Sequence, residues 1–131
     1  MVEYVVDQTG FRIYATPRGV LDLSKILRYF KRLKSDHRIR QNAIDIIDVK
    51  NITDFKTPYI NSNLITEVYR NPEIIHKIEA TFLICESNLA YKIGKILQSI
   101  HEMANPDHKV IIVRSGKDLE SVIKRFKMIF S

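Results

Sequence analysis

The chain has few of the residues on which several classes of protein depend. Among its 131 residues is one cysteine, Cys85, which excludes an internal disulfide and suits a reducing compartment such as the cytoplasm. Its four glycines do not cluster as in loops that wrap a phosphate chain. The longest apolar runs, such as residues 110–113, are far below the ~20 residues of a membrane-spanning helix. No signal peptide is visible, so we expect a cytoplasmic protein without a membrane span.

Motifs for catalysis and metal binding are also missing from the sequence. The four histidines are scattered, and no two of them have the spacing of metal ligands. There is no Gly-x-Ser-x-Gly elbow, no Cys-x-x-Cys pair and no dinucleotide-binding fingerprint. We therefore expect no cofactor, no metal and no enzymatic activity.

Positive charge, in contrast, is plentiful and unevenly placed. The formal net charge is +6. Residues 25–40 contain a single acidic residue, Asp36, and seven basic ones, namely Lys25, Arg28, Lys31, Arg32, Lys34, Arg38 and Arg40. Such a stripe permits an anionic partner, nucleic acid included. Because its members fall at the exposed positions of a helix, a solvated surface is the simpler interpretation.

Short apolar segments alternate with amphipathic ones along the whole chain. Strands are predicted over residues 2–6, 11–15, 43–49, 78–85 and 110–113. The first two are separated by four residues and predict a hairpin. Helices are predicted to begin at Asp22, Thr57-Pro58, Asn88 and Ser115. The resulting order is ββαβαβαβα.

This order predicts one α/β domain over residues 1–131, with a mostly parallel mixed sheet, an antiparallel N-terminal hairpin and four helices. Phe82 and Ile112 are expected in the middle of central strands. Asp45 is expected at an edge or beside a basic side chain. The first helix is expected to leave Tyr29 exposed. The longest helix should bury one apolar stripe, comprising Leu89, Ile93, Ile96, Leu97, Ile100 and Met103.

Several segments carry a hydrophobic pattern that is known from one family. They are Gly19-Val20, residues 46–49 with 52–55, residues 90–95, residues 110–114 and residues 119–122. In these segments the chain resembles the STAS/SpoIIAA-like family, best known from anti-sigma-factor antagonists, and is closer still to bacterial SpoIIAA-like proteins of unassigned function. The resemblance implies a STAS-like fold and a regulatory or protein-interaction role. It places a protein partner at Asp54, Phe55, Lys56, Thr57 and Tyr59.

One departure from that family bears on regulation. Antagonists carry Asp-Ser-Ser-Gly, with the kinase target serine, where this chain has Asp54-Phe55-Lys56-Thr57. Thr57 is the nearest hydroxyl, and its place before Pro58 is already explained as a helix cap. The resemblance therefore does not extend to the phosphorylation switch.

The strand ends provide a second candidate site. Ligands of open α/β sheets bind outside the carboxyl ends of the strands. Seven polar or aromatic residues follow the predicted strands there, namely Asp48, Asn51, Ser87, Asn88, Tyr91, Arg114 and Ser115. Asp48 and Asp54 suit either a metal or acid/base pair or, more simply, hydrogen bonds within a turn. Arg114-Ser115 at a helix start suits an anion.

Three functions are compatible with these patterns. The first is a non-catalytic cytoplasmic regulatory or interaction domain with a protein partner, and a homodimer is compatible with it. The second is a small-molecule binder that holds an apolar or anionic ligand near residues 85–91. The third and weakest is nucleic-acid binding by the basic first helix, which lacks a recognised binding motif.

Overall fold

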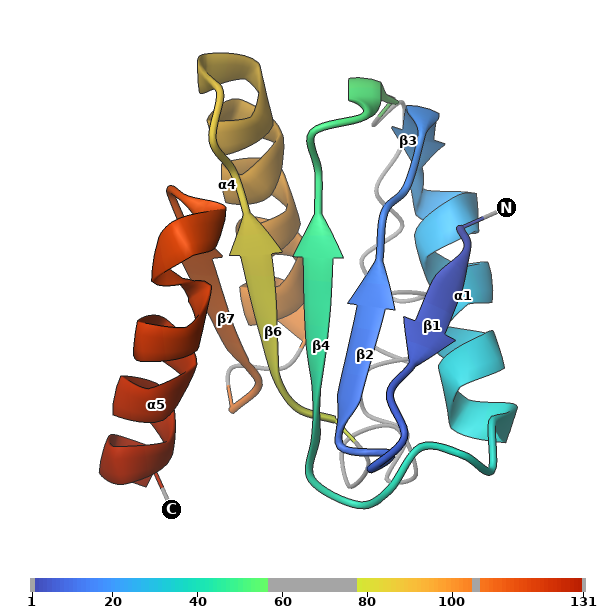
Figure 1. Ribbon diagram of the computed structural model, residues 1–131. Coiled ribbons are helices and arrows are strands. Elements are labelled where there is room, and N and C mark those ends of the chain that lie inside the picture. Colours follow the sequence, from blue (N-terminus) through green and yellow to red (C-terminus); the bar gives the residue numbers. More distant parts are fainter. Residues whose placement is uncertain (1, 57–77, 105–106, 131) are drawn as a thin grey trace.

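A five-stranded sheet forms the centre of the protein (Figure 1). The computed structural model describes residues 2–56, 78–104 and 107–130. The strands of the sheet lie in the order β1-β2-β4-β6-β7. Their bounds are Tyr4–Val6 for β1, Arg12–Ala15 for β2, Ala43–Asp48 for β4, Ile78–Ile84 for β6 and Lys109–Val113 for β7. β1 and β2 form the predicted antiparallel hairpin, and β2, β4, β6 and β7 are mutually parallel.

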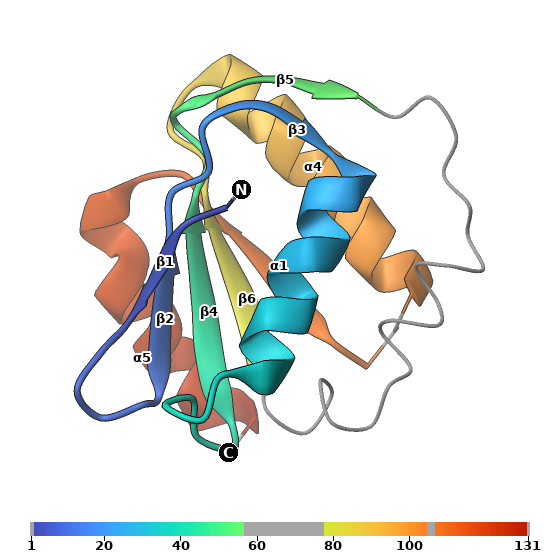
Figure 2. The same cartoon turned by 90° about the vertical axis from the view of Figure 1, so that its right-hand side faces the viewer.

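Helices cover both faces of this sheet. α1 (Leu23–Ser35) and α4 (Asn88–Ala104) pack on one face, and α5 (Leu119–Phe130) packs on the other (Figure 2). α1 begins where predicted, because the Asp22 carboxylate accepts a hydrogen bond from the Lys25 N–H at 2.9 Å. A short 3₁₀ helix, η1 (Gly116–Asp118), leads into α5. None of the described helices is both long and apolar enough to cross a membrane.

Two further strands were not predicted. β3 (Gly19–Asp22) and β5 (Ile52–Lys56) form a separate two-stranded parallel sheet. Residues 52–56, for which neither a helix nor a strand was predicted, thus form a strand. The pair begins at Gly19, whose φ of 72° suits glycine and whose N–H donates to the carbonyl of Asn51 at 2.9 Å. Four residues carry too little periodicity to reveal such a strand.

The two faces of the sheet have different cores. Ile13, Ile47, Leu83 and other residues pack beneath α1 and α4, whereas Ile44, Phe82 and their neighbours pack beneath α5. Phe82 is fully buried in β6, between β4 and β7, as predicted. Ile112 is only half-buried, because β7 is an edge strand of the sheet. Its predicted central position is wrong.

Three expectations about side-chain exposure are also wrong. Asp45 lies fully buried in the middle strand β4, where no basic side chain pairs with it among the described residues. Tyr29 is buried rather than exposed, because its hydroxyl donates to Asp45 Oδ1 at 2.5 Å. Leu89 and Ile96 are exposed, since they lie outside the arc of α4 that faces the sheet. Ile93, Leu97 and Ile100 are buried as predicted.

The described residues contain three α-helices, whereas four were predicted. The helix predicted to begin at Thr57-Pro58 lies outside the described residues. An α/β fold with a mostly parallel mixed sheet and an N-terminal hairpin is confirmed.

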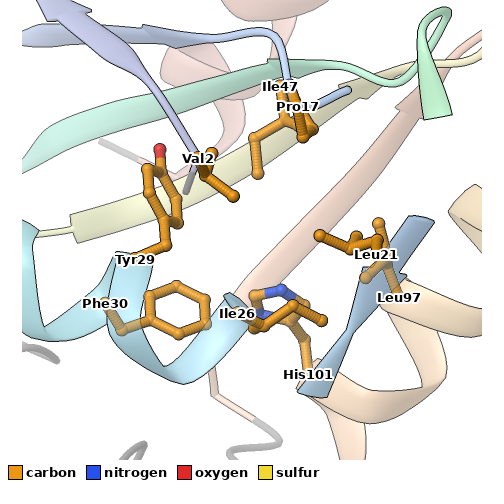
Figure 3. Close-up of a pocket in the computed structure, with 9 residues that line it drawn as sticks. All are labelled: Val2, Pro17, Leu21, Ile26, Tyr29, Phe30, Ile47, Leu97 and His101. Carbon is orange, nitrogen blue, oxygen red and sulfur yellow. The ribbon is translucent and has the colours of Figure 1, made fainter. Parts of the chain in front are cut away.

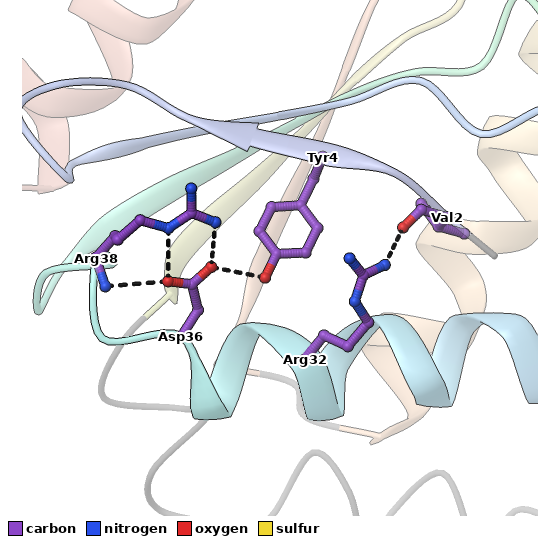
Figure 4. A network of polar contacts seen from close by, with 5 residues as sticks. All are labelled: Val2, Tyr4, Arg32, Asp36 and Arg38. Atoms are coloured by element: carbon purple, nitrogen blue, oxygen red, sulfur yellow. Dashed lines mark hydrogen bonds and ion pairs between the residues drawn. The ribbon is translucent and has the colours of Figure 1, made fainter.

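Polar contacts fasten β1 to the end of α1 (Figure 4). The Tyr4 hydroxyl donates to Asp36 Oδ2 at 2.7 Å, and Arg38 binds the same carboxylate. Arg32 lies over the Tyr4 ring at 4.9 Å and donates to the carbonyl of Val2. These partners account for part of the basic stripe of α1.

Candidate functional site

The carboxyl ends of the three neighbouring strands β4, β6 and β7 meet at one edge of the sheet. Asp48 pairs with Ile84, and Ile84 pairs with Val113, so the strands end level with one another. The Cys85 N–H donates to the carbonyl of Val113 at 2.8 Å and continues this alignment beyond the strands. We call the residues that follow the strands the strand-end rim. It comprises Asp48, Asn51, Glu86, Ser87, Asn88, Leu89, Tyr91, Arg114 and Ser115.

An aromatic ring and a guanidinium group are stacked at this rim. The Arg114 Cζ atom lies 4.2 Å from the centre of the Tyr91 ring. Lys95 lies over the same ring at 5.9 Å. Arg114 follows β7 and Tyr91 lies in the first turns of α4, so the contact joins two segments that are distant in sequence. A cation over an aromatic face is stabilised by the ring's quadrupole, which holds both side chains in place.

Polar groups of the rim are already used by the backbone. Ser87 Oγ accepts from the Ala90 N–H at 3.0 Å and caps α4, and Ser115 Oγ accepts from the Lys117 N–H and caps η1. Asp48 accepts from the Lys50 N–H at 3.1 Å and lies 3.7 Å from the Lys50 ammonium. The simpler interpretation of Asp48 as a turn residue is therefore supported by geometry.

Cys85 lies beneath the rim as a packed thiol. Burial raises its pKa to about 11, Arg114 acts to lower that pKa and Asp48 acts to raise it. Its sulfur lies 3.6 Å from the carbonyl oxygen of Leu83 and packs against Gly94. At neutral pH the group is a thiol rather than a thiolate, which makes it a poor nucleophile.

The predicted partner-binding residues lie partly on β5. Asp54 and Lys56 are exposed on this strand, whereas Phe55 is half-buried and packs against the core beneath α1 and α4. Thr57 and Tyr59 lie outside the described residues. β5 and the first turns of α4 lie at the same end of the molecule (Figure 2). The exposed side chains of Asp54 and Lys56 thus continue the surface of the rim onto β5.

The seven residues that the sequence placed at the strand ends all belong to the rim, and Glu86 and Leu89 complete it. Asp48, Tyr91 and Arg114 come together as the parallel arrangement predicted. Asn51 is half-buried and Asn88 is exposed; the Asn51 carbonyl is held by Gly19. Leu89, 52% exposed, was assigned to the core because it matched the helical period. Leu89 lies at the margin of the buried arc of α4, which is formed by Ala90, Ile93, Leu97 and Ile100.

A small apolar cavity lies between the sheet, α1, β3 and α4 (Figure 3). Its volume is about 30 Å³, and its walls include Leu21, Ile26, Phe30 and Leu97. This is room for on the order of one water molecule or methyl group. Tyr29 and His101 line it too, and the described residues show no trio of His, Cys, Asp or Glu side chains placed to hold a metal ion.

Comparison with known proteins defines the fold. No protein-family model matches the sequence, and no curated protein does. Among solved structures, the chain is similar to an uncharacterised protein of the DUF3478 family from Shewanella loihica, which has a SpoIIAA-like fold. The TM-score is 0.55 at 10% identity, over 93% of this chain and 91% of that chain.

This chain has a SpoIIAA-like fold. The resemblance in hydrophobic pattern is therefore confirmed at the level of structure, and the DUF3478 protein shares the fold rather than a described activity. Within the SpoIIAA-like fold of this chain, the strand-end rim is the candidate site.

Proposed function

We propose that this chain is a non-catalytic, regulatory protein-interaction domain whose partner binds the strand-end rim. The observation that carries the proposal is the Arg114–Tyr91 stack, with Leu89 exposed in the same turn of α4. Arginine and tyrosine supply a large share of the energy in protein interfaces. Because Arg114 already holds the Tyr91 ring, a partner that binds there loses little side-chain entropy.

The rest of the rim supports a partner surface more than a chemical site. Ser87 and Ser115 cap helices, and the Cys85 thiol is protonated and buried. Asp54 and Lys56 on β5 widen the exposed surface in the direction that the family resemblance implies. A cytoplasmic setting is part of the proposal, and the buried free thiol supports it.

The two other functions are less well supported. The apolar cavity of about 30 Å³ is too small for a metabolite as it stands. Both aromatic residues of α1, Tyr29 and Phe30, are buried, so this helix offers no aromatic face on which a base can stack.

Partner capture from a lysate of the cells that make the protein tests the proposal. Wild type is compared with Tyr91→Ala/Arg114→Ala and with Lys31→Ala, a control that removes an exposed cation from α1. We expect one protein to be retained by wild type and by Lys31→Ala and to be lost from the double variant. Native mass spectrometry of the freshly purified chain distinguishes the small-molecule alternative, because a retained ligand adds a discrete mass below ~1 kDa. Such an adduct without a captured protein would reject the proposed function.

A further inference from the structure

Four large apolar side chains are exposed at the end of the molecule opposite the rim. They are Phe11 at 44%, Met128 at 74%, Ile129 at 71% and Phe130 at 53% exposure. Scattered single apolar residues are ordinary on a protein surface, but three consecutive ones are not. Met128, Ile129 and Phe130 form the last turn of α5.

The fold gathers these residues at the amino ends of the parallel strands. α5 follows β7 and runs back along the sheet, so its last turn returns to the level at which β7 begins. The hairpin turn before β2 and the connection from α1 to β4 reach the same level (Figures 1 and 2). The two segments are joined there, because the Arg40 N–H donates to the carbonyl of Gly10 at 2.8 Å.

Cations accompany these apolar groups. Arg40 lies over the Phe11 ring at 5.6 Å, and Lys109 lies over the Phe130 ring at 5.4 Å. From residue 123 to 130 the charged residues of α5 are all basic, namely Lys124, Arg125 and Lys127. We call this surface the amino-end face. It comprises Phe11, Arg38, Arg40, Lys109, Lys124, Arg125, Lys127, Met128, Ile129 and Phe130.

Nearby acidic groups offset only part of this charge. The Asp36 carboxylate is bound by Arg38 at 2.7 Å. Asp7 accepts hydrogen bonds from the backbone N–H groups of Gly10 and Arg12 within the hairpin turn. Asp107 and Glu102 flank the start of β7. Glu79, the second residue of β6, lies level with the start of β7. Among the described residues, the six basic residues of the face outnumber these five acidic residues.

We propose that the amino-end face docks on an anionic lipid bilayer. Apolar tips ringed by cations match a surface that has negative charge at its boundary and an apolar interior beneath it. In this arrangement Met128, Ile129 and Phe11 enter the interface, while Lys124, Arg125 and Arg40 contact headgroups. The rim at the opposite end stays available, so this second surface goes beyond the proposed protein interaction and does not depend on it.

Co-sedimentation of the full chain with lipid vesicles tests this proposal. Vesicles of phosphatidylcholine alone are compared with vesicles that contain ~30% phosphatidylserine, at ~100 mM salt, where exposed charges act over roughly 10 Å. We expect wild type to partition onto the anionic vesicles and to remain largely free of the neutral ones. Equal partitioning, or none onto the anionic vesicles, would overturn the proposal.

Matched variants separate this face from the general charge of the protein. Met128→Glu/Ile129→Glu should lower partitioning at least tenfold, whereas Leu89→Glu, which places one such negative charge at the rim, should leave it unchanged. Lys124→Gln/Arg125→Gln should lower it by roughly tenfold or more, and Lys92→Gln/Lys117→Gln should have little effect. Circular dichroism confirms that each variant is folded. Wild-type affinity in the double-glutamate variant, or an equal loss in Leu89→Glu, would contradict the assignment. Binding to duplex DNA in place of vesicles would also contradict it.

Discussion

The hydroxyl of Tyr29 in α1 donates to Oδ1 of Asp45 in β4, at 2.5 Å, in a fully buried part of the core. Asp45 Oδ2 has no hydrogen-bond partner among the described residues. Burial raises the pKa of Asp45 to about 7, and the bond from Tyr29 acts to lower it. The sheet thus holds, beneath α1, a carboxylic acid whose pKa lies near neutral pH.

Asp45→Asn should stabilise the protein more at pH 8 than at pH 5. Between pH 3.8 and about 7 the folded chain keeps a proton that the unfolded chain releases. The wild-type free energy of unfolding therefore loses up to ~1.4 kcal/mol per pH unit from this group as pH rises. His101 and His108 act in the opposite sense, because burial lowers their pKa values, that of His108 to about 4.

Urea unfolding of wild type and Asp45→Asn at several pH values between 5 and 8 measures this effect. The histidines are common to both proteins, so their contributions cancel in the difference. The stability difference should grow up to about pH 7 and then level off. A difference that does not change with pH would show that Asp45 titrates normally.

Gly94→Ala should destabilise the protein, because a methyl group at this position would overlap Cys85 Sγ. Overpacking of this kind costs ~1–3 kcal/mol. Cys85→Ala makes room, so the double variant Gly94→Ala/Cys85→Ala should lose less than the sum of the two single changes. Gly116→Ala, where the nearest atom would be 3.4 Å away on an exposed side chain, is the control. Additive losses in a double-mutant cycle would rule out the contact.

Phe82→Ala should cost ~3–5 kcal/mol, since Phe82 is fully buried and its ring centre lies 5.6 Å from that of Phe126. Ile112→Ala should cost clearly less, because Ile112 is half-buried on the edge strand β7. Thermal melting of both variants measures the difference. Equal losses would be inconsistent with the strand order β4-β6-β7.

Most of the sheet could be predicted because its signals are local. The uninterrupted apolar run at 82–84 indicated a strand buried on both faces, and Asp22 indicated the start of α1. β3 and β5 could not be predicted, because they are short and their pairing joins segments about thirty residues apart. The edge position of β7 was missed because its sequence, like that of the central strand β6 at residues 82–84, is an almost continuous run of apolar residues.

The location of the candidate site could be predicted from the sequence, whereas the contacts that its side chains make could not. Parallel topology alone places Asp48, Tyr91 and Arg114 at one edge. That Ser87 and Ser115 serve as caps, and that Tyr29 turns inward to Asp45, depends on tertiary contacts that no periodicity reveals. A buried carboxyl group next to a tyrosine has no signal in single-sequence patterns, since aspartate is mostly exposed in proteins and tyrosine is intermediate in burial.

Site-specific photo-crosslinking in cells tests the proposed interaction rim most directly. Benzoylphenylalanine is placed at Leu89, in the rim, and in a second strain at Val5, an apolar position of β1 that is 65% exposed and lies outside the rim. We predict a discrete protein adduct from position 89 after irradiation and none from position 5. No adduct from position 89, or adducts of equal yield from both positions, would contradict the assignment of the rim as the partner-binding surface.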